Sequence, residues 1–322
     1  MIVFITSRGH GYTVRSMIDR TLGAPVPDVR VIHYEQLFRS WWLPRATYVF
    51  CDFDRLLPWM QERAAQLYRV MRAVGLRCLN DPARVMLRAE LLTRLEQEGI
   101  NPFGVYRADT CPRPRRFPVF IRSEGGHAMP FTALHEDQTA LEAGLRALRE
   151  SGLPLRGLLV IECASEPYGG GLWAKWGTWR IGSHTFVEHI AVDTTWMVKT
   201  GVNALIEGAV AEDERAAVLN NRYGPDLSPI FDLAHVDYGR ADHGRHSGRT
   251  IVFEINTNPY IGYFVPGRHQ ARDEAQIHAR THIAQALHDI DTPHGGRIVL
   301  PDWRRRRPWD WMKLRWGGIA GP

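Results

Sequence analysis

The N-terminal quarter of the chain alternates between short apolar runs and an amphipathic segment, and this alternation restricts the fold more than any other feature. Apolar or β-branched runs at 1–6, 29–33 and 48–51 predict strands. Helical spacing of apolar residues over 58–74, followed by Gly75, predicts a helix that ends there. Strands and helices that alternate over so short a stretch favour a small parallel α/β unit.

The composition is that of a globular chain long enough for two domains or for one enzyme built of subdomains. Of the 322 residues, 44% are hydrophobic and 23% are charged, which excludes a collagenous, coiled-coil or disordered chain. No apolar run approaches the roughly 20 residues of a membrane span, and the first residues lack the pattern of a signal peptide. The cysteines (Cys51, Cys78, Cys111, Cys163) show neither metal nor disulfide spacing. We therefore expect a soluble, cytoplasmic protein.

The net charge of +5 comes mostly from the C-terminal segment 301–322, which is rich in arginine and tryptophan. This segment holds six basic and two acidic residues, a net charge of +4, so the first 300 residues are nearly neutral. Its composition suits either docking on its own domain or contact with an acidic surface, membrane headgroups or RNA. Nucleic acid is thus expected as a partner only through this segment.

Beyond the N-terminal unit, predicted helices and strands are mixed. Predicted helices cover 80–99, 135–151, 210–223 and 273–288, and the first of them begins at the capping sequence Asn80-Asp81-Pro82. Predicted strands cover 117–122, 158–162, 172–181, 185–191, 231–237 and 250–255, with a Gly/His/Arg turn at 239–248 between the last two.

Three oxygen-bearing side chains near the last strands form the densest polar group. Glu254 and Asn256 stand two residues apart on a predicted strand, so their side chains share a face, and Asp237 ends the preceding predicted strand. Mg²⁺ prefers such oxygen ligands and leaves further positions to water and phosphate oxygens. The alternative is an exposed strand face that ends in an Asn-Pro turn. We expect a metal site formed by Asp237, Glu254 and Asn256.

The order of these segments resembles the ATP-grasp superfamily. The resemblance rests on the Asn80-Asp81-Pro82 helix, the 118–122 strand with its glycine loop, the 160–162 hinge, and Glu254-x-Asn256-x-Asn258-Pro259 after Asp237. It implies an α/β fold with α+β subdomains, an ATP-grasp fold that follows an N-terminal parallel α/β unit. The implied division is 1–78 for the N-terminal unit, 79–160 and 161–295 for the two ATP-grasp subdomains, and 296–322 for the basic tail.

The resemblance also implies that ATP lies between the two subdomains together with Mg²⁺ or Mn²⁺. The metal would be held by Asp237, Glu254 and Asn256. Adenine would meet the hinge, the ribose would meet the residue just after the hinge, and the phosphates would meet the glycine loop. The residues implied to bind the nucleotide in these places are Glu162, Cys163, Ala164, Glu166, Gly125, Gly126 and Asn258.

Arginine stands where the family pattern has lysine. Arg122 ends the strand before the glycine loop, and Arg84 and Arg88 lie in the preceding predicted helix. A guanidinium still neutralises phosphate and can chelate it, but with a different geometry. This departure leaves open a catalytically weak member of the family.

Three cations in or beside the strands after the hinge are candidates for the cleft. Lys175 and Arg180 on one predicted strand are placed to meet the charge of the γ-phosphate or of an acylphosphate, and Lys199 is placed to meet a substrate carboxylate. The alternative for each is a charge on a solvent-facing strand. With Arg122, these residues form the expected catalytic set.

Other polar residues are weaker candidates. The turn at 9–11 either holds an anionic substrate or is an ordinary turn after the first strand. We interpret Asp52 and Asp54 as loop caps, and His243 and His246 as solvated side chains of a hairpin turn.

The function implied by the resemblance is that of an ATP- and Mg²⁺-dependent ligase. It would activate a carboxylate as an acylphosphate and join it to an amine, thiol or similar nucleophile, with release of ADP and phosphate. Kinase-like phosphoryl transfer and nucleotide binding without catalysis are the alternatives. The expected partners are small-molecule or peptide carboxylates and amines, and a homodimer is the default assembly.

Overall fold

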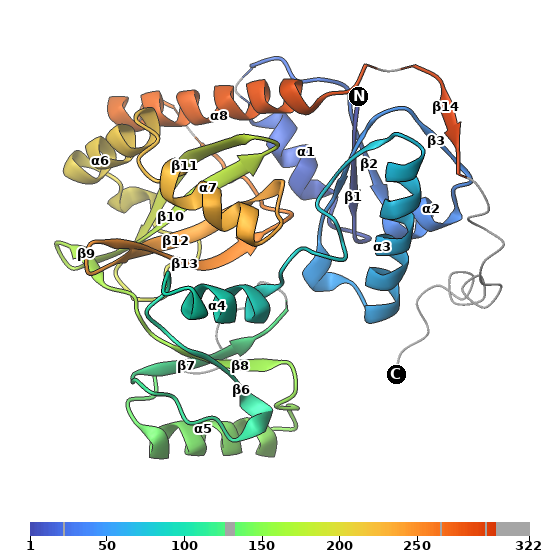
Figure 1. Cartoon of the computed structure of the whole chain (residues 1–322). Helices are drawn as coiled ribbons and strands as arrows, with labels where there is room; N and C mark the ends of the chain where they lie inside the picture. Colours follow the sequence, from blue (N-terminus) through green and yellow to red (C-terminus); the bar gives the residue numbers. More distant parts are fainter. Residues whose placement is uncertain (22, 126–132, 265, 294, 301–322) are drawn as a thin grey trace.

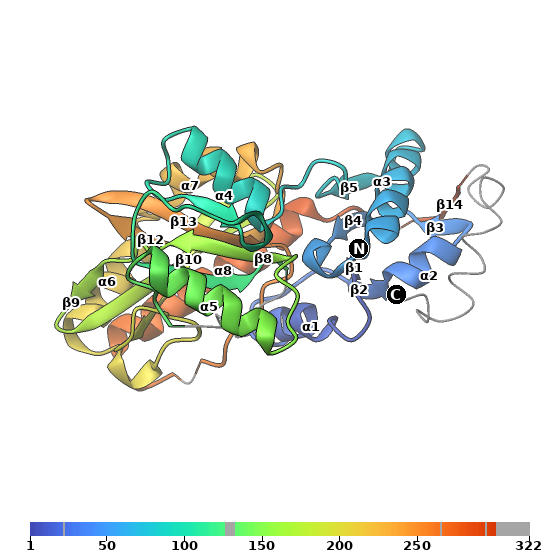
Figure 2. The same ribbon diagram turned by 90° about the horizontal axis from the view of Figure 1, so that it is seen from below.

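The computed structural model describes residues 1–21, 23–125, 133–264, 266–293 and 295–300. Gly126 and the basic segment 301–322 therefore lie outside the described residues. The chain forms an N-terminal unit beside two further units, a central one and one with a large sheet, which lie one below the other in Figure 1 and are seen from below in Figure 2. None of the described helices is long and apolar enough to cross a membrane.

The N-terminal unit is the parallel α/β unit that the sequence predicts. Its four strands are all parallel in the order β2-β1-β4-β5. They are β1 (Ile2–Thr6), β2 (Val29–His33), β4 (Thr47–Phe50) and β5 (Arg77–Leu79), connected through the helices α1 (Tyr12–Asp19), α2 (Tyr34–Arg39) and α3 (Pro58–Ala73) and the 3₁₀ turn η1 (Phe53–Arg55). A separate antiparallel pair joins β3 (Trp42–Pro44) to β14 (Arg297–Val299), so the chain returns to this unit at its end.

Both faces of this sheet are buried, which explains the unbroken apolar sequence of β1. Ile2 and Phe4 belong to one core with α1 and with α8 (Gln270–Ile290), whereas Val3 and Ile5 belong to another core with α2 and α3. The alternation of side chains along a strand produces this division. Because α8 comes from the large-sheet unit, its packing joins the two units through one core.

The central unit is a small antiparallel sheet covered by one helix. The sheet has the order β6-β8-β7 and consists of β6 (Val105–Arg107), β7 (Val119–Ser123) and β8 (Leu158–Glu162), with the 3₁₀ turn η2 (Ala108–Thr110) after β6. Helix α5 (Gln138–Glu150) begins at Asp137, whose side chain accepts a hydrogen bond from Ala140 N at 2.8 Å. Its leucines, spaced three and four residues apart, pack against β7 and β8.

The large sheet is antiparallel and has the order β11-β10-β12-β13, with β9 (Pro167–Gly169) paired to the start of β10. Its long strands are β10 (Leu172–Ile181), β11 (His184–Asp193), β12 (Tyr238–His246) and β13 (Arg249–Asn256). Helices α6 (Gly208–Leu219), α7 (Gly224–Leu233) and α8 pack against β11, helix α4 (Arg88–Gln97) packs against β13, and the turn η3 (Asn203–Leu205) follows β11. The predicted α/β class is confirmed.

Three segments differ from the predictions. The predicted strand 231–237 is the end of α7 and the connection after it, and the predicted turn 239–248 is mostly the strand β12. Helix α4 begins at Arg88 rather than at Asn80, because the Asn80 side chain has other partners. Asn80, at φ 62°, donates to the carbonyl groups of Phe50 and Tyr238, and so ties β4 to β12.

Candidate active site

A cavity of about 660 Å³ is lined by side chains from all three units. The N-terminal unit contributes the loops after β1 and β4, and the central unit contributes β7 and β8. The large-sheet unit contributes residues of β10 to β13 and one side of α8. A cavity of this size at a junction of domains suits a small-molecule ligand.

One part of the cavity wall is apolar, and we call it the apolar slot. It is formed by Phe120 of β7, Ile161 of β8, and Trp196 and Met197 from the loop after β11. The rings of Phe120 and Trp196 lie 5.0 Å apart. Aromatic side chains in such an arrangement suit a planar, partly apolar ligand group.

The predicted hinge borders the apolar slot, but its side chains are largely committed to the protein. The carboxylate of Glu162 accepts hydrogen bonds from Gly104 N, Tyr106 Oη, Arg115 N and Arg116 N, at 2.8 to 3.1 Å. Glu162 therefore organises the 104–116 segment. Ala164 lines the cavity, whereas the N–H of Cys163 donates to the carbonyl of Pro118 at 2.9 Å.

The polar wall of the cavity is built on the pairing of β12 with β13. In that register Asp242 lies opposite Glu254, and Arg240 lies opposite Asn256. All four side chains line the cavity. Lys175 of β10, which also lines it, donates to Asp242 Oδ2 at 2.8 Å. Burial tends to raise the pKa of Asp242, but Lys175 and Arg240 outweigh burial and hold it below its ordinary value.

Glu254 is held by two arginines. Arg88 of α4 makes an ion pair with Glu254 Oε2, and Arg122 Nη2 at the end of β7 lies 3.4 Å from the same oxygen. Burial and the nearby Asp242 raise the pKa of Glu254, yet the two arginines bring it below its ordinary value. Both carboxylates of this wall are therefore ionised at neutral pH.

The structure does not bring Asp237 to this group. Asp237 precedes β12, and its carboxylate accepts a hydrogen bond from Asn80 N at 3.1 Å, away from the residues that line the cavity. Asp242 stands opposite Glu254 in its place. The reason is that the segment 239–248, which was predicted to be a turn, is mostly the strand β12. Its carboxylate, that of Asp242, therefore reaches the cavity.

Several other predicted residues also lie elsewhere. Arg84 contacts the ring of His235 at 3.1 Å, and Arg180 makes an ion pair with Asp232 at 2.8 Å. Glu166 accepts hydrogen bonds from Ser247 N at 2.9 and 3.0 Å. None of these three predicted residues lines the cavity, and neither does Gly125, which stands at the edge of the described residues. Lys199 does line it, and its carbonyl accepts a hydrogen bond from Lys175.

Asn258 connects the polar wall to the N-terminal unit. Its backbone N–H donates to Asn256 Oδ1 at 2.8 Å. Its side-chain amide donates to Asp52 Oδ1 at 2.8 Å and accepts from Thr13 Oγ1 at 2.5 Å. Asp52, at φ 59°, also accepts from Ser7 N and Oγ, so its role as an organiser of a loop agrees with the interpretation from the sequence.

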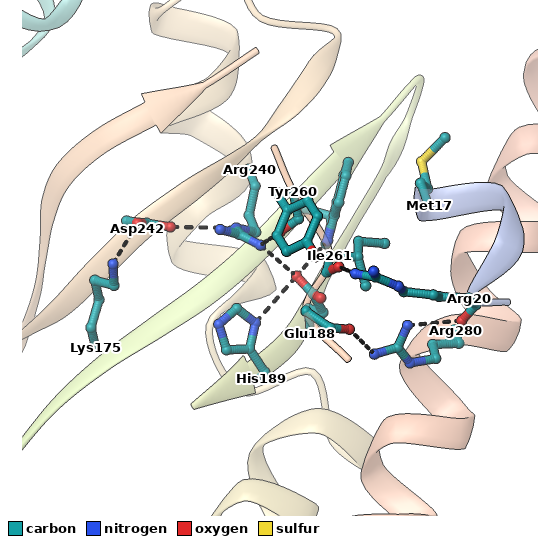
Figure 3. A network of polar contacts seen from close by, with 12 residues as sticks. Met17, Arg20, Lys175, Glu188, His189, Arg240, Asp242, Tyr260, Ile261 and Arg280 are labelled. Atoms are coloured by element: carbon teal, nitrogen blue, oxygen red, sulfur yellow. Dashed lines mark hydrogen bonds and ion pairs between the residues drawn. The ribbon is translucent and has the colours of Figure 1, made fainter. Parts of the chain in front are cut away.

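A second set of charged residues extends the polar wall toward α8, and the sequence did not single it out. Arg240 donates to Glu188 Oε2 at 3.2 Å, and His189 Nδ1 lies 3.2 Å from the same oxygen (Figure 3). Burial raises the pKa of Glu188, but His189 and Arg240 lower it to about 2. On the strand β12, Arg240 and Asp242 alternate with buried Ala241. This period of two is the signal in the sequence that could have identified 239–248 as a strand with a charged face.

His243 is not solvated, contrary to the interpretation from the sequence. Its side chain is fully buried, with its Nε2 2.8 Å from Thr178 Oγ1 and its ring against Tyr223. Burial lowers the pKa of His243 to about 3, so the imidazole is neutral. His246 is partly exposed, with its Nδ1 3.0 Å from the carbonyl of Ala164.

No protein-family model and no curated protein matches the chain. Among solved structures, it is similar to a D-alanine–D-alanine ligase from Bacillus anthracis complexed with ATP, at 12% identity over 90% of this chain and 95% of that chain, with a TM-score of 0.48. It is similar to a RimK domain ATP-grasp protein from Sphaerobacter thermophilus, at 14% identity over 89% and 99%, with a TM-score of 0.45. It is also similar to the ATP-grasp ligase PsnB, complexed with a precursor variant, Mg and ADP, at 12% identity over 89% and 96%, with a TM-score of 0.48.

Proposed function

We propose that this protein is an ATP-dependent ligase of the ATP-grasp kind that joins a carboxylate to an amine and releases ADP and phosphate. The observation that carries the proposal is one cavity in which an apolar slot adjoins a wall of paired cations and carboxylates. The slot would hold adenine, and Arg122 and Lys175 would meet the phosphates. The solved structures named above agree with this proposal.

The residues of the polar wall fit a divalent cation. Asp242, Glu254 and Asn256 offer three oxygen donors from two neighbouring strands. Asp242 Oδ1 is buried, lies 3.4 Å from Arg240 Nε and accepts no hydrogen bond from the described residues. Within the same residues no group of three or more His, Cys, Asp or Glu side chains forms a metal site, so the amide of Asn256 is needed as the third donor. Mg²⁺ would complete its six ligands with phosphate oxygens and water, and Mn²⁺ accepts similar ligands. The bound metal would supply neutralisation of phosphate charge.

The protein's own side chains would position the reactants and stabilise charge. Arg122 and Lys175 already lie within ion-pair distance of Glu254 and Asp242, so they stand at the cavity wall where phosphate oxygens would approach. Arg240, between Asp242 and Glu188, is placed to stabilise negative charge that develops on the reacting carboxyl group. The amine would then displace phosphate from the acylphosphate in a site closed to water.

The screen that tests the proposal measures ADP formation from ATP with a pool of amino acids and small carboxylic acids. We expect turnover that needs both an acid and an amine and that stops when EDTA removes the metal. Free phosphate in equal amount to ADP identifies a ligase, whereas phosphate retained on a product identifies the kinase-like alternative. Binding of ATP in a thermal-shift titration without any ADP formation would favour the non-catalytic alternative.

A further inference from the structure

One side of α8 presents three long polar side chains to the cavity, and we call them the α8 subsite: Arg272, Gln276 and Arg280. They stand four residues apart, so they follow one another along a single helix face. All three line the cavity, and Gln276 and Arg280 are 4% and 3% exposed. Figure 3 shows Lys175 and Asp242 on one side of Arg240, and Arg20 and Arg280 on the other. Arg280 of the α8 subsite thus lies on the other side of Arg240 from Lys175 and Asp242 of the proposed phosphate and metal site.

Within the described residues, every hydrogen bond of Arg280 goes to a neutral group. Its guanidinium donates to the carbonyl of Arg20 at 2.8 Å, to the carbonyl of Gly262 at 3.2 Å and to Gln276 Oε1 at 3.4 Å. Its Nε is buried and has no hydrogen-bond partner among the described residues. Among the residues that the structure describes, no carboxylate makes an ion pair with Arg280.

The neighbours of Arg280 add positive charge. Arg20 donates to the carbonyl of Ile261 and lies over the ring of Tyr263, at 3.8 Å from its centroid, again without a carboxylate partner among the described residues. Arg272 lies 3.6 Å from buried Glu214, and its Nη1 has no hydrogen-bond partner in the described structure. Burial lowers the pKa of Arg280; the charge of Glu188 opposes this, but repulsion from Arg20 and Arg272 adds to the lowering.

A buried guanidinium without an ion pair is unfavourable, and the more distant charge of Glu188 does not outweigh the burial of Arg280. A negatively charged group that enters the cavity would stabilise it. The planar fork of arginine matches a carboxylate with two parallel hydrogen bonds. Glu188, whose charge raises the pKa of Arg280, makes its hydrogen bonds to Arg240 and to Trp179 Nε1, the latter at 2.7 Å, and not to Arg280.

We propose that the α8 subsite binds a substrate carboxylate that takes no part in the reaction. This inference rests on the proposed ligase function, and it adds that one of the two substrates carries a second, remote carboxylate. That substrate is either a dicarboxylic acid or an amine that bears a carboxylate.

The first test is calorimetric binding without nucleotide, with glutarate as the charged probe and its uncharged diamide, glutaramide, as the control ligand. The variants are Arg272→Gln, Arg272→Lys, and the matched control Arg146→Gln, which removes an exposed arginine of α5. Arg272 is chosen because Arg280 holds three backbone and side-chain groups in place, so its loss could unfold the site. We expect glutarate to bind the wild type and the Arg146→Gln variant alike, and about tenfold or more weaker to Arg272→Gln, with partial recovery in Arg272→Lys. Equal binding of glutarate and glutaramide, or unchanged glutarate binding in Arg272→Gln, would overturn the inference.

The second test uses turnover to assign the remote carboxylate to the acid or to the amine. Each substrate that supports ADP formation is compared with an analogue that lacks the second carboxylate, in the wild type and in Arg272→Gln. We expect a KM at least tenfold lower for the doubly charged member of one pair, and loss of that difference in the variant. The pair that responds, acids or amines, identifies the source. Active substrates with no such preference contradict the subsite. Absence of ADP formation with every substrate contradicts the ligase proposal instead, while the calorimetric result still decides the subsite.

Discussion

The proposal that Asp242, and not Asp237, binds the metal leads to the sharpest prediction. We expect Asp242→Asn to abolish most metal-dependent ATP turnover and Asp237→Asn to leave it close to the wild-type value. Asp242 lines the cavity opposite Glu254, whereas Asp237 contacts the backbone of Asn80. The two substitutions remove the same charge from positions five residues apart, so each is the control for the other.

The expected size of the effect follows from the contacts. Loss of a side chain that only supports a metal ligand typically lowers affinity or activity about 10- to 100-fold, so loss of a ligand is expected to lower kcat/KM by about 100-fold or more. Asp242→Asn also leaves Lys175 and Arg240 without their shared carboxylate, 2.8 and 3.4 Å away, which costs about 3 kcal/mol of stability. In Asp237→Asn the amide oxygen still accepts from Asn80 N, so we expect a loss of about 1 kcal/mol or less.

The assay is ADP formation over a range of Mg²⁺ concentrations, well below the unfolding temperature of each variant. A far-ultraviolet circular dichroism spectrum confirms that each variant is folded. A higher Mg²⁺ requirement in Asp242→Asn would identify a weakened metal site. Wild-type turnover in Asp242→Asn, or loss of turnover in Asp237→Asn alone, would refute the assignment.

Four further predictions follow from individual contacts. Arg122→Lys should keep ADP formation within about tenfold of the wild type, because the charge stays, and Arg122→Gln should lower it about 100-fold; equal losses in both would contradict a charge role. Glu254→Gln should abolish turnover yet strengthen metal-free ATP binding in calorimetry, because Arg88 and Arg122 lose their competing partner. Glu188, with its pKa lowered to about 2 from 4.5, contributes stability at neutral pH that is lost as the pH falls below 4.5, so urea unfolding at pH 3 should show about 2 kcal/mol less acid destabilisation in Glu188→Gln than in the wild type. Glu162→Gln should lower the free energy of unfolding by about 2 to 3 kcal/mol, since an amide cannot accept all four hydrogen bonds, and an unchanged value would remove Glu162 as the organiser of the hinge.

The sequence was sufficient to predict a strand and its polar face where the pattern of apolar and polar residues agrees with the burial of that strand. The strand that carries Glu254 and Asn256 has apolar neighbours at the alternate positions, so its register and its polar face were both readable. The parallel N-terminal unit was predictable for a similar reason, since a sheet buried on both faces requires continuous apolar runs such as Ile2–Thr6.

The sequence failed where a polar face is turned toward a cavity rather than toward solvent. The strand β12, with two glycines and several charged or histidine residues, has the composition of a turn, yet it lies between β10 and β13. Its charged residues Arg240 and Asp242 face ligand space, and Ala241 and His243 are buried. On α8 the sequence likewise does not show whether Arg272 and Arg280 face solvent or a cavity, because arginines on an amphipathic helix ordinarily face solvent. Only tertiary placement distinguishes the two cases.

The arrangement of charges also explains how two neighbouring carboxylates can persist before a ligand arrives. Asp242 and Glu254 lie close enough that the charge of Asp242 disfavours that of Glu254, and each is compensated by two cations: Lys175 and Arg240 for Asp242, and Arg88 and Arg122 for Glu254. Of these four cations, all but Arg88 line the cavity. Asp242 and Glu254 would hold a bound metal, which would supply positive charge, while Arg122 and Lys175 would be free to meet phosphate oxygens. Each buried charge would then have an opposite charge beside it both before and after binding, which is the condition that makes its burial tolerable. The same reasoning separates Arg280 from this group, because its hydrogen bonds in the described structure go to carbonyl and amide oxygens, so a ligand carboxylate would meet it without displacing a carboxylate of the protein.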